Sequence, residues 1–250
     1  MSLKKFIPWI TVLATLATIV INILANALPF NDLNTGEISD RYPVLFVPAG
    51  YVFAIWGVIY IGWIAYSIYQ VLPANRDSET LQKIAPLYWL ASLANSVWLV
   101  FWHFEQFALT LPVMLVLLAC LIRIYLLIRP AKATFSSAAV WSVSIPFSVY
   151  LGWITVATVA NASQLLYWIN WSGWGISPVA WTVIMIAVTG SLGVAMLIRE
   201  RDAAYALVLV WALLGIAAKQ SAIQSIALPA YITAGILAIG ILLVFARKSR

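Results

Sequence analysis

The sequence predicts an all-α protein, a polytopic membrane helix bundle. Hydrophobic residues make up 64% of its 250 residues and charged residues only 9%, with a mean hydropathy of +0.99. A soluble domain with this composition has too few polar residues to cover its surface. The apolar residues also form long runs, and a helix of roughly 20 apolar residues crosses a bilayer core of about 30 Å. Both observations exclude a soluble enzyme or a soluble binding module.

About eight transmembrane helices are predicted, because polar, charged or proline-containing breaks separate eight apolar runs. The seventh run is the shortest, since it lies between Asp202 and Lys219. Pro178 and Pro229 are predicted to begin helices, where the missing N–H of proline costs nothing. The predicted spans are 6–28, 47–71, 84–102, 107–128, 135–160, 178–198, 203–220 and 227–246.

The positive charges predict the orientation of these spans. With a cytoplasmic N-terminus, all 14 Lys and Arg residues except Arg41 and Lys219 fall on the cytoplasmic side. The C-terminus is then cytoplasmic as well, and this arrangement requires the short seventh span. The same bias explains the net charge of +6 without a nucleic-acid partner. We expect a multi-pass protein in a bacterial inner membrane, with an organellar membrane as the alternative.

The sequence contains few groups that could perform catalysis. It has one histidine, His103, and one cysteine, Cys120, and no predicted span contains Asp or Glu. A catalytic metal site or an acid–base pair needs several such groups close together. We therefore predict that the protein is not an enzyme and has no obligatory cofactor or metal. One enzymatic alternative is the photo-oxidation of a bound tetrapyrrole, with a tryptophan as the redox-active group.

Aromatic residues form a stripe on the second predicted span. Phe53, Trp56, Tyr60 and Trp63 follow one another at helical spacings of three and four. The chain has 13 tryptophans and 11 tyrosines, more than two interfacial belts require, so some must lie inside the bundle. Flat rings with few ionisable groups suit a large planar, apolar ligand.

Two further spans combine aromatic residues with one amide each. Asn95 and Trp98 share a face of the third span. The corresponding face of the fifth span carries Tyr150, Trp153, Ala157 and Asn161. Taken singly, each of these two faces is also explained by packing, with the amides bonded across helices.

Taken in order, the three stripes resemble the successive signatures of the translocator protein family, also called tryptophan-rich sensory proteins or peripheral benzodiazepine receptors. Residues 48–60 are similar to its Pro-Pro-x-Trp-x-Phe-x-x-x-Trp-x-x-Leu-Tyr motif, residues 94–98 to Leu-Asn-x-x-Trp, and residues 153–161 match Trp-x-x-x-Ala-x-x-x-Asn. Tyr51 stands where the first motif has tryptophan, Ala49 replaces one proline, and Pro146 is displaced. The resemblance covers residues 1–162.

The resemblance implies a five-helix ligand-binding bundle over residues 1–162, followed by a three-helix extension over residues 163–250. It implies a cavity that binds a porphyrin or haem-like tetrapyrrole, a sterol or a synthetic aromatic ligand, and a homodimer. From the stripes and the resemblance together, the predicted ligand-binding residues are Tyr51, Phe53, Trp56, Tyr60, Asn95, Trp98, Tyr150, Trp153, Ala157 and Asn161.

Two other classes of function stay open. A small-solute transporter would line its path with the amides and with the polar row Thr11, Thr15, Thr18 and Asn22 of the first span. The sequence lacks two usual marks of that class, an internal repeat and a charged residue in mid-membrane. We expect this row to form interhelical hydrogen bonds instead. A structural or assembly subunit, in which the aromatic residues only pack, is the third possibility.

Overall fold

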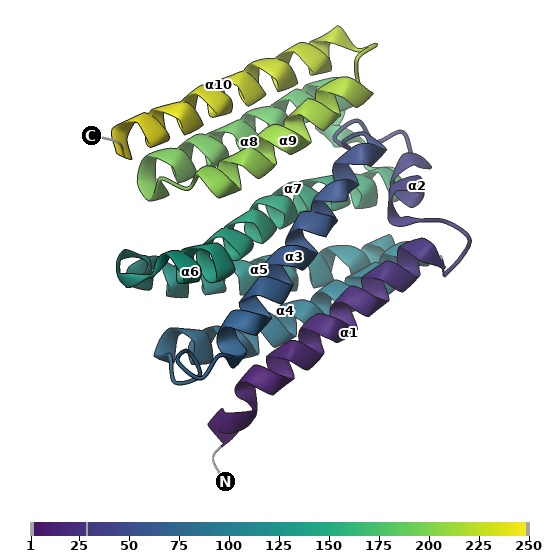
Figure 1. The fold of residues 1–250 in the computed structure, drawn as a ribbon. Helices are drawn as coiled ribbons and strands as arrows, with labels where there is room; N and C mark the ends of the chain where they lie inside the picture. The colour runs from purple at the N-terminus through teal and green to yellow at the C-terminus, as the bar shows by residue number, and fades with distance from the viewer. Residues whose placement is uncertain (1–2, 29, 249–250) are drawn as a thin grey trace. The chain divides into compact units, whose positions relative to one another are not determined.

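The computed structural model describes residues 3–28 and 30–248, and every regular element within them is a helix. The chain divides into two compact units, each described by itself below and drawn in Figure 1. Unit 1 comprises residues 1–38 and 55–151, and unit 2 comprises residues 39–54 and 152–250. The boundaries between the units fall inside α2 (Thr35–Asp40), after Ala54, and inside α7 (Ile145–Trp168).

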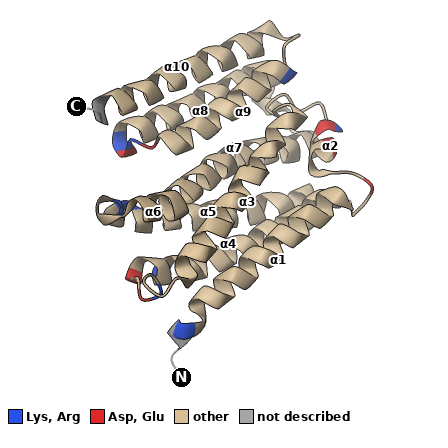
Figure 2. Ribbon diagram, viewed as in Figure 1, with Lys and Arg blue, Asp and Glu red and all other residues tan. Residues whose placement is uncertain are grey.

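Seven helical segments within the described residues are long and apolar enough to cross a membrane. Each overlaps one of the predicted spans, and Figure 2 shows the charged residues gathered at helix ends and connections. The remaining predicted span, 203–220, is the apolar helix α9 (Ala203–Lys219), whose 17 residues make it shorter than the others. The seven segments are Ile7–Ala27, Gly50–Val71, Glu79–His103, Phe107–Thr134, Ser137–Trp168, Pro178–Glu200 and Gln224–Ala246.

Unit 1 is built from α1 (Ile7–Ala27), α3 (Ile55–Val71), α4 (Glu79–His103) and α5 (Phe107–Ala131), with the first residues of α7. Helix α4 packs against both α1 and α5, and α1 also packs against α3. It also contains four short segments: η1 (Leu3–Phe6), η3 (Lys132–Thr134), α6 (Ser137–Ala139) and the π-helix η4 (Val140–Ser144). Most of the short helix α2 (Thr35–Asp40) also belongs to this unit.

The polar row of α1 forms hydrogen bonds to neighbouring helices, as the sequence predicts. Thr15 Oγ1 lies 2.6 Å from both the Ser67 Oγ and the Tyr88 hydroxyl, so one threonine joins α1 to α3 and α4. Two turns later on the same face of α1, the Asn22 Nδ2 donates to the Asn95 Oδ1 over 2.8 Å. Since hydrocarbon offers no alternative partners, such bonds are a strong constraint on how these helices pack.

Unit 2 contains α8 (Pro178–Glu200), α9 and α10 (Gln224–Lys248), which pack against one another, and the second part of α7. It also contains the 3₁₀ helices η2 (Gly50–Ala54) and η5 (Gly173–Gly175). Glycines allow the helices to approach closely. A Cβ on Gly190 would lie 2.5 Å from the Thr233 Cγ2, and one on Gly152 would lie 3.1 Å from the Tyr205 carbonyl oxygen.

Side-chain caps mark several helix starts that the sequence signals. Ser78, Ser177 and Asp202 each accept a hydrogen bond from the backbone N–H three residues later. Pro178 begins α8, as predicted. The prediction for Pro229 is wrong, because this proline lies inside α10, which already begins at Gln224.

Two predicted spans differ from the structure in ways that affect the site. In the second, residues 50–54 form the 3₁₀ helix η2, so Phe53 and Trp56 do not lie on one continuous α-helix. The fifth extends beyond 135–160 to Trp168, which places Asn161 inside a helix. Falling hydropathy suggested a break there, but no glycine or proline interrupts the chain before Gly173.

Replacing Asn95 with alanine tests the polar contacts of unit 1. Asn95 is fully buried, accepts from Asn22 and donates to the Tyr150 hydroxyl over 3.2 Å. We expect Asn95→Ala to lower the free energy of unfolding by about 1–3 kcal/mol, because both partners lose a buried hydrogen bond. Thermal unfolding in detergent measures this loss.

The matched control is Ser96→Ala on the same helix, because the Ser96 hydroxyl donates to the Ser92 carbonyl oxygen one turn earlier, at 3.0 Å, within its own helix. Its effect should stay within about 0.5 kcal/mol. Equal destabilisation by the two substitutions would contradict the role given to Asn95.

Candidate functional site

Four aromatic residues of unit 1 form a cluster, here called the unit-1 cluster: Trp56, Tyr60 and Trp63 of α3 and Tyr150 of α7. The Trp63 and Tyr150 ring centroids are 5.0 Å apart, and Trp56 lies 6.2 Å from Tyr150 and 6.0 Å from Tyr60. Trp63 and Tyr150 are buried, whereas Trp56 and Tyr60 are partly exposed. Most of these contacts are edge-to-face, a favourable geometry for aromatic pairs.

The two predicted residues of α4 have different surroundings. Asn95 reaches the unit-1 cluster, because its Nδ2 donates to the Tyr150 hydroxyl. Trp98 stacks on Trp102 with ring centroids 5.3 Å apart and an interplanar angle of 22°. Trp102 in turn contacts Phe107 and donates from Nε1 to the Thr35 carbonyl oxygen over 3.2 Å. Trp98 is thus part of the packing that holds the loop after α1.

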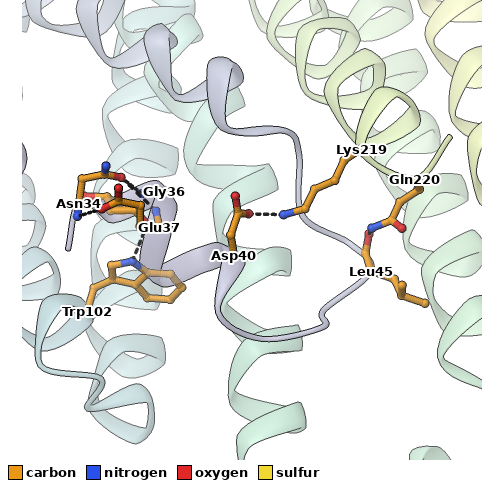
Figure 3. A network of polar contacts seen from close by, with 9 residues as sticks. Asn34, Gly36, Glu37, Asp40, Leu45, Trp102, Lys219 and Gln220 are labelled. Carbon is orange, nitrogen blue, oxygen red and sulfur yellow. Dashed lines mark hydrogen bonds and ion pairs between the residues drawn. The ribbon is translucent and has the colours of Figure 1, made fainter. Parts of the chain in front are cut away.

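That loop carries a well-formed turn, drawn in Figure 3. The Asn34 Oδ1 accepts from the backbone N–H groups of Gly36 and Glu37, each at 3.0 Å, and the Glu37 Oε2 accepts from the Asn34 N–H at 2.7 Å. This reciprocal arrangement is a capping box, and it starts α2. His103 is fully buried beside it, with Nε2 3.2 Å from the Thr35 Oγ1.

Two aromatic pairs of unit 2 share the segment η2 and are here together called the unit-2 cluster: Tyr51 with Trp211, and Phe53 with Trp153. Phe53 meets Trp153 edge-to-face with centroids 5.7 Å apart, and Tyr51 meets Trp211 in the same way at 5.5 Å. Trp153 is buried, but Tyr51 is 54% exposed. Ala157 and Asn161 follow Trp153 on the same face of α7.

Helix α9 holds the segment that carries Tyr51 and Phe53. The Trp211 Nε1 donates to the Val52 carbonyl oxygen over 3.0 Å, and the Ala49 N–H donates to the Gly215 carbonyl oxygen over 3.1 Å. Gly215 itself permits a close approach, because a Cβ there would lie 2.1 Å from the Val52 Cγ2.

The end of α9 ties down the preceding loop. Lys219 forms an ion pair with Asp40, and the Gln220 Nε2 donates to the Leu45 carbonyl oxygen over 3.1 Å (Figure 3). Spacing along the sequence cannot reveal these contacts, since they join residues more than 150 positions apart. Trp211, Gly215 and Lys219 are therefore site-supporting residues that the sequence did not identify.

The predicted ligand-binding residues thus fall into groups within each unit. Unit 1 holds Trp56, Tyr60, Asn95, Trp98 and Tyr150, and unit 2 holds the others: Tyr51, Phe53, Trp153, Ala157 and Asn161.

The two clusters present flat rings, hydroxyls and indole N–H groups, and the predicted residues Asn95 and Asn161 add neutral amides. Among the described residues, no group of three or more His, Cys, Asp or Glu side chains could hold a metal ion. The aromatic rings can stack on a ligand, and the hydroxyl and amide groups can orient it through hydrogen bonds.

Replacing Gly215 with alanine tests whether α9 positions the aromatic segment. The new methyl group would overlap Val52, which is fully buried, and would also approach Pro48. We expect a loss of about 1–3 kcal/mol in the free energy of unfolding, as for other overpacked positions. Thermal unfolding in detergent is the measurement.

Gly235→Ala in α10 is the control for that substitution, because nothing lies within 4 Å of its added Cβ. It should be neutral or stabilise the helix by up to about 1 kcal/mol. If Gly215→Ala were as stable as Gly235→Ala, α9 would not constrain the segment.

A comparison with protein families accounts for almost the whole chain. The model of the family described as TSPO-like protein matches residues 8–243, including α8, α9 and most of α10, beyond the part for which the sequence motifs show a resemblance. No curated protein and no solved structure matches the chain. The chain belongs to the TSPO-like protein family.

Proposed function

We propose that this membrane protein binds a planar lipophilic molecule, with a porphyrin or related tetrapyrrole as the first candidate, and acts as a receptor, sensor or carrier. The observation that supports this most directly is the unit-2 cluster, in which the motif residues Phe53 and Trp153 meet at 5.7 Å. Rigid rings lose little side-chain entropy when they contact a ligand, so they favour reversible binding.

In this proposal the predicted residues have different roles. The rings provide stacking surface, and the small Ala157 beside Trp153 leaves space for a flat molecule to approach α7. Asn95 already bonds to Asn22 and Tyr150, so we assign it the role of positioning the Tyr150 ring. Tyr51, more than half exposed, is the ring most accessible to an incoming ligand.

We also propose that residues 1–162 form the ligand-binding bundle and that the extension over residues 163–250 supports it. Helix α9 of this extension forms hydrogen bonds to the segment that carries Tyr51 and Phe53, and this is how we propose that the extension supports the site. A transporter is less well supported, because Thr15 and Asn22 of the polar row bond to neighbouring helices.

Replacing Trp153 with phenylalanine tests the proposal. Phenylalanine keeps a ring but loses part of the stacking surface, so we expect the dissociation constant for protoporphyrin to rise about two- to tenfold. The readout should be the fluorescence of the directly excited porphyrin. Tryptophan quenching is unsuitable, because the substitution itself removes one of the fluorescent tryptophans.

Trp141→Phe is the matched control, since Trp141 precedes α7 on the same apolar segment but is 70% exposed. It should leave the affinity unchanged. Non-saturable partitioning of the porphyrin, equal in the parent and both variants, would overturn the proposal and favour a structural or assembly role.

A further inference from the structure

Gln164 of α7 is buried without any hydrogen-bond partner among the described residues. Only 1% of its surface is exposed, and neither Nε2 nor Oε1 of its side-chain amide is bonded. Leaving a buried donor or acceptor unsatisfied costs about 1–3 kcal/mol, and native proteins rarely do so. An amide with both of its polar atoms in this state needs an explanation.

The position of Gln164 connects it with the unit-2 cluster. It follows Asn161 by three residues, Ala157 by seven and Trp153 by eleven, so all four lie on one face of α7. Between residues 157 and 168, only Asn161 and Gln164 are buried, which shows that this face continues inward to Gln164. One turn later, Tyr167 contacts Tyr42 of the loop with ring centroids 6.1 Å apart.

We propose that Gln164 binds a carboxyl group of the ligand, an assignment that rests on the proposed function. A primary amide presents a donor and an acceptor side by side, and a carboxylic acid presents the complementary pair. A carboxylate would use only the Nε2 donor. The seven residues from Ala157 to Gln164 rise about 10 Å along the helix, which suits a flat ring with an acid arm.

The unpaired amide of Gln164 favours an acid over a purely apolar ligand. Helix α7 contains no Lys or Arg, so an amide is the group on this helix available to an acid arm. An etioporphyrin, which has the same ring and no polar arm, would leave Gln164 unsatisfied. The ligand class is therefore a planar lipophile that carries at least one carboxyl group.

The experiment compares the parent protein with Gln164→Met, which keeps the length of the side chain and removes its polar atoms. Three probes share one ring system: protoporphyrin with two free acids, its dimethyl ester and etioporphyrin. Each dissociation constant is measured by porphyrin fluorescence. We expect Gln164→Met to weaken protoporphyrin binding about tenfold, the ester less, and etioporphyrin not at all.

A second measurement separates ligand binding from a structural role. Without ligand, Gln164→Met should unfold at a higher temperature than the parent, because the unsatisfied amide is gone. Gln82→Met, at a partly exposed position where the Gln82 Nε2 donates to the Arg76 carbonyl oxygen at 3.0 Å, is the control and should change none of the three affinities.

Each failure has a distinct signature. If all three porphyrins bind saturably and Trp153→Phe weakens them, but Gln164→Met changes the three affinities equally or not at all, the carboxyl assignment is wrong and the proposed function stands. If no porphyrin binds saturably to the parent, both proposals fall together. A lower unfolding temperature of ligand-free Gln164→Met would show that the amide is structural, which also overturns the assignment.

Discussion

The structure depends on one constraint: buried polar groups in a membrane must find partners within the protein, because hydrocarbon supplies none. In unit 1 the bonds from Asn22 to Asn95 and from Asn95 to Tyr150 meet this constraint and join α1, α4 and α7. Thr15 does the same for α1, α3 and α4. A few single polar atoms, such as the Tyr66 hydroxyl and the Gln70 Oε1, are buried without a partner, but among the described residues only Gln164 has two such atoms, and we propose that a ligand group satisfies them.

The same constraint shapes the chemistry of the site. Charges are expensive within the bilayer, so in the proposed function rings and neutral amides recognise the ligand, and most charged residues lie at helix ends and connections. The unit-2 cluster is then kept in place by backbone contacts, since α9 bonds to Val52 and Ala49 on either side of Tyr51. The C-terminal helices thereby have a direct physical connection to the aromatic residues that carry the proposed function.

Much of this could be predicted from the sequence, because hydropathy and helical spacing are local signals. They predicted the membrane helices and the polar row of α1. Local signals do not reveal that residues 50–54 form a 3₁₀ helix or that α7 continues to Trp168. The contact of Gly215 with Val52 depends on tertiary packing. Gln164 follows Asn161 at a helical spacing, but the span was predicted to end at residue 160, so this face was not followed beyond Asn161.

The central claim is that the aromatic face of α7 and the segment carrying Phe53 bind a planar lipophile. Photo-crosslinking with a diazirine-bearing porphyrin, followed by mass spectrometry of the peptides, tests it most directly. We expect saturable adducts on residues 51–53 and 153–164, which an excess of unmodified protoporphyrin removes. Adducts confined to outward-facing residues such as Trp9, Trp141 and Leu242, and insensitive to competitor, would contradict it.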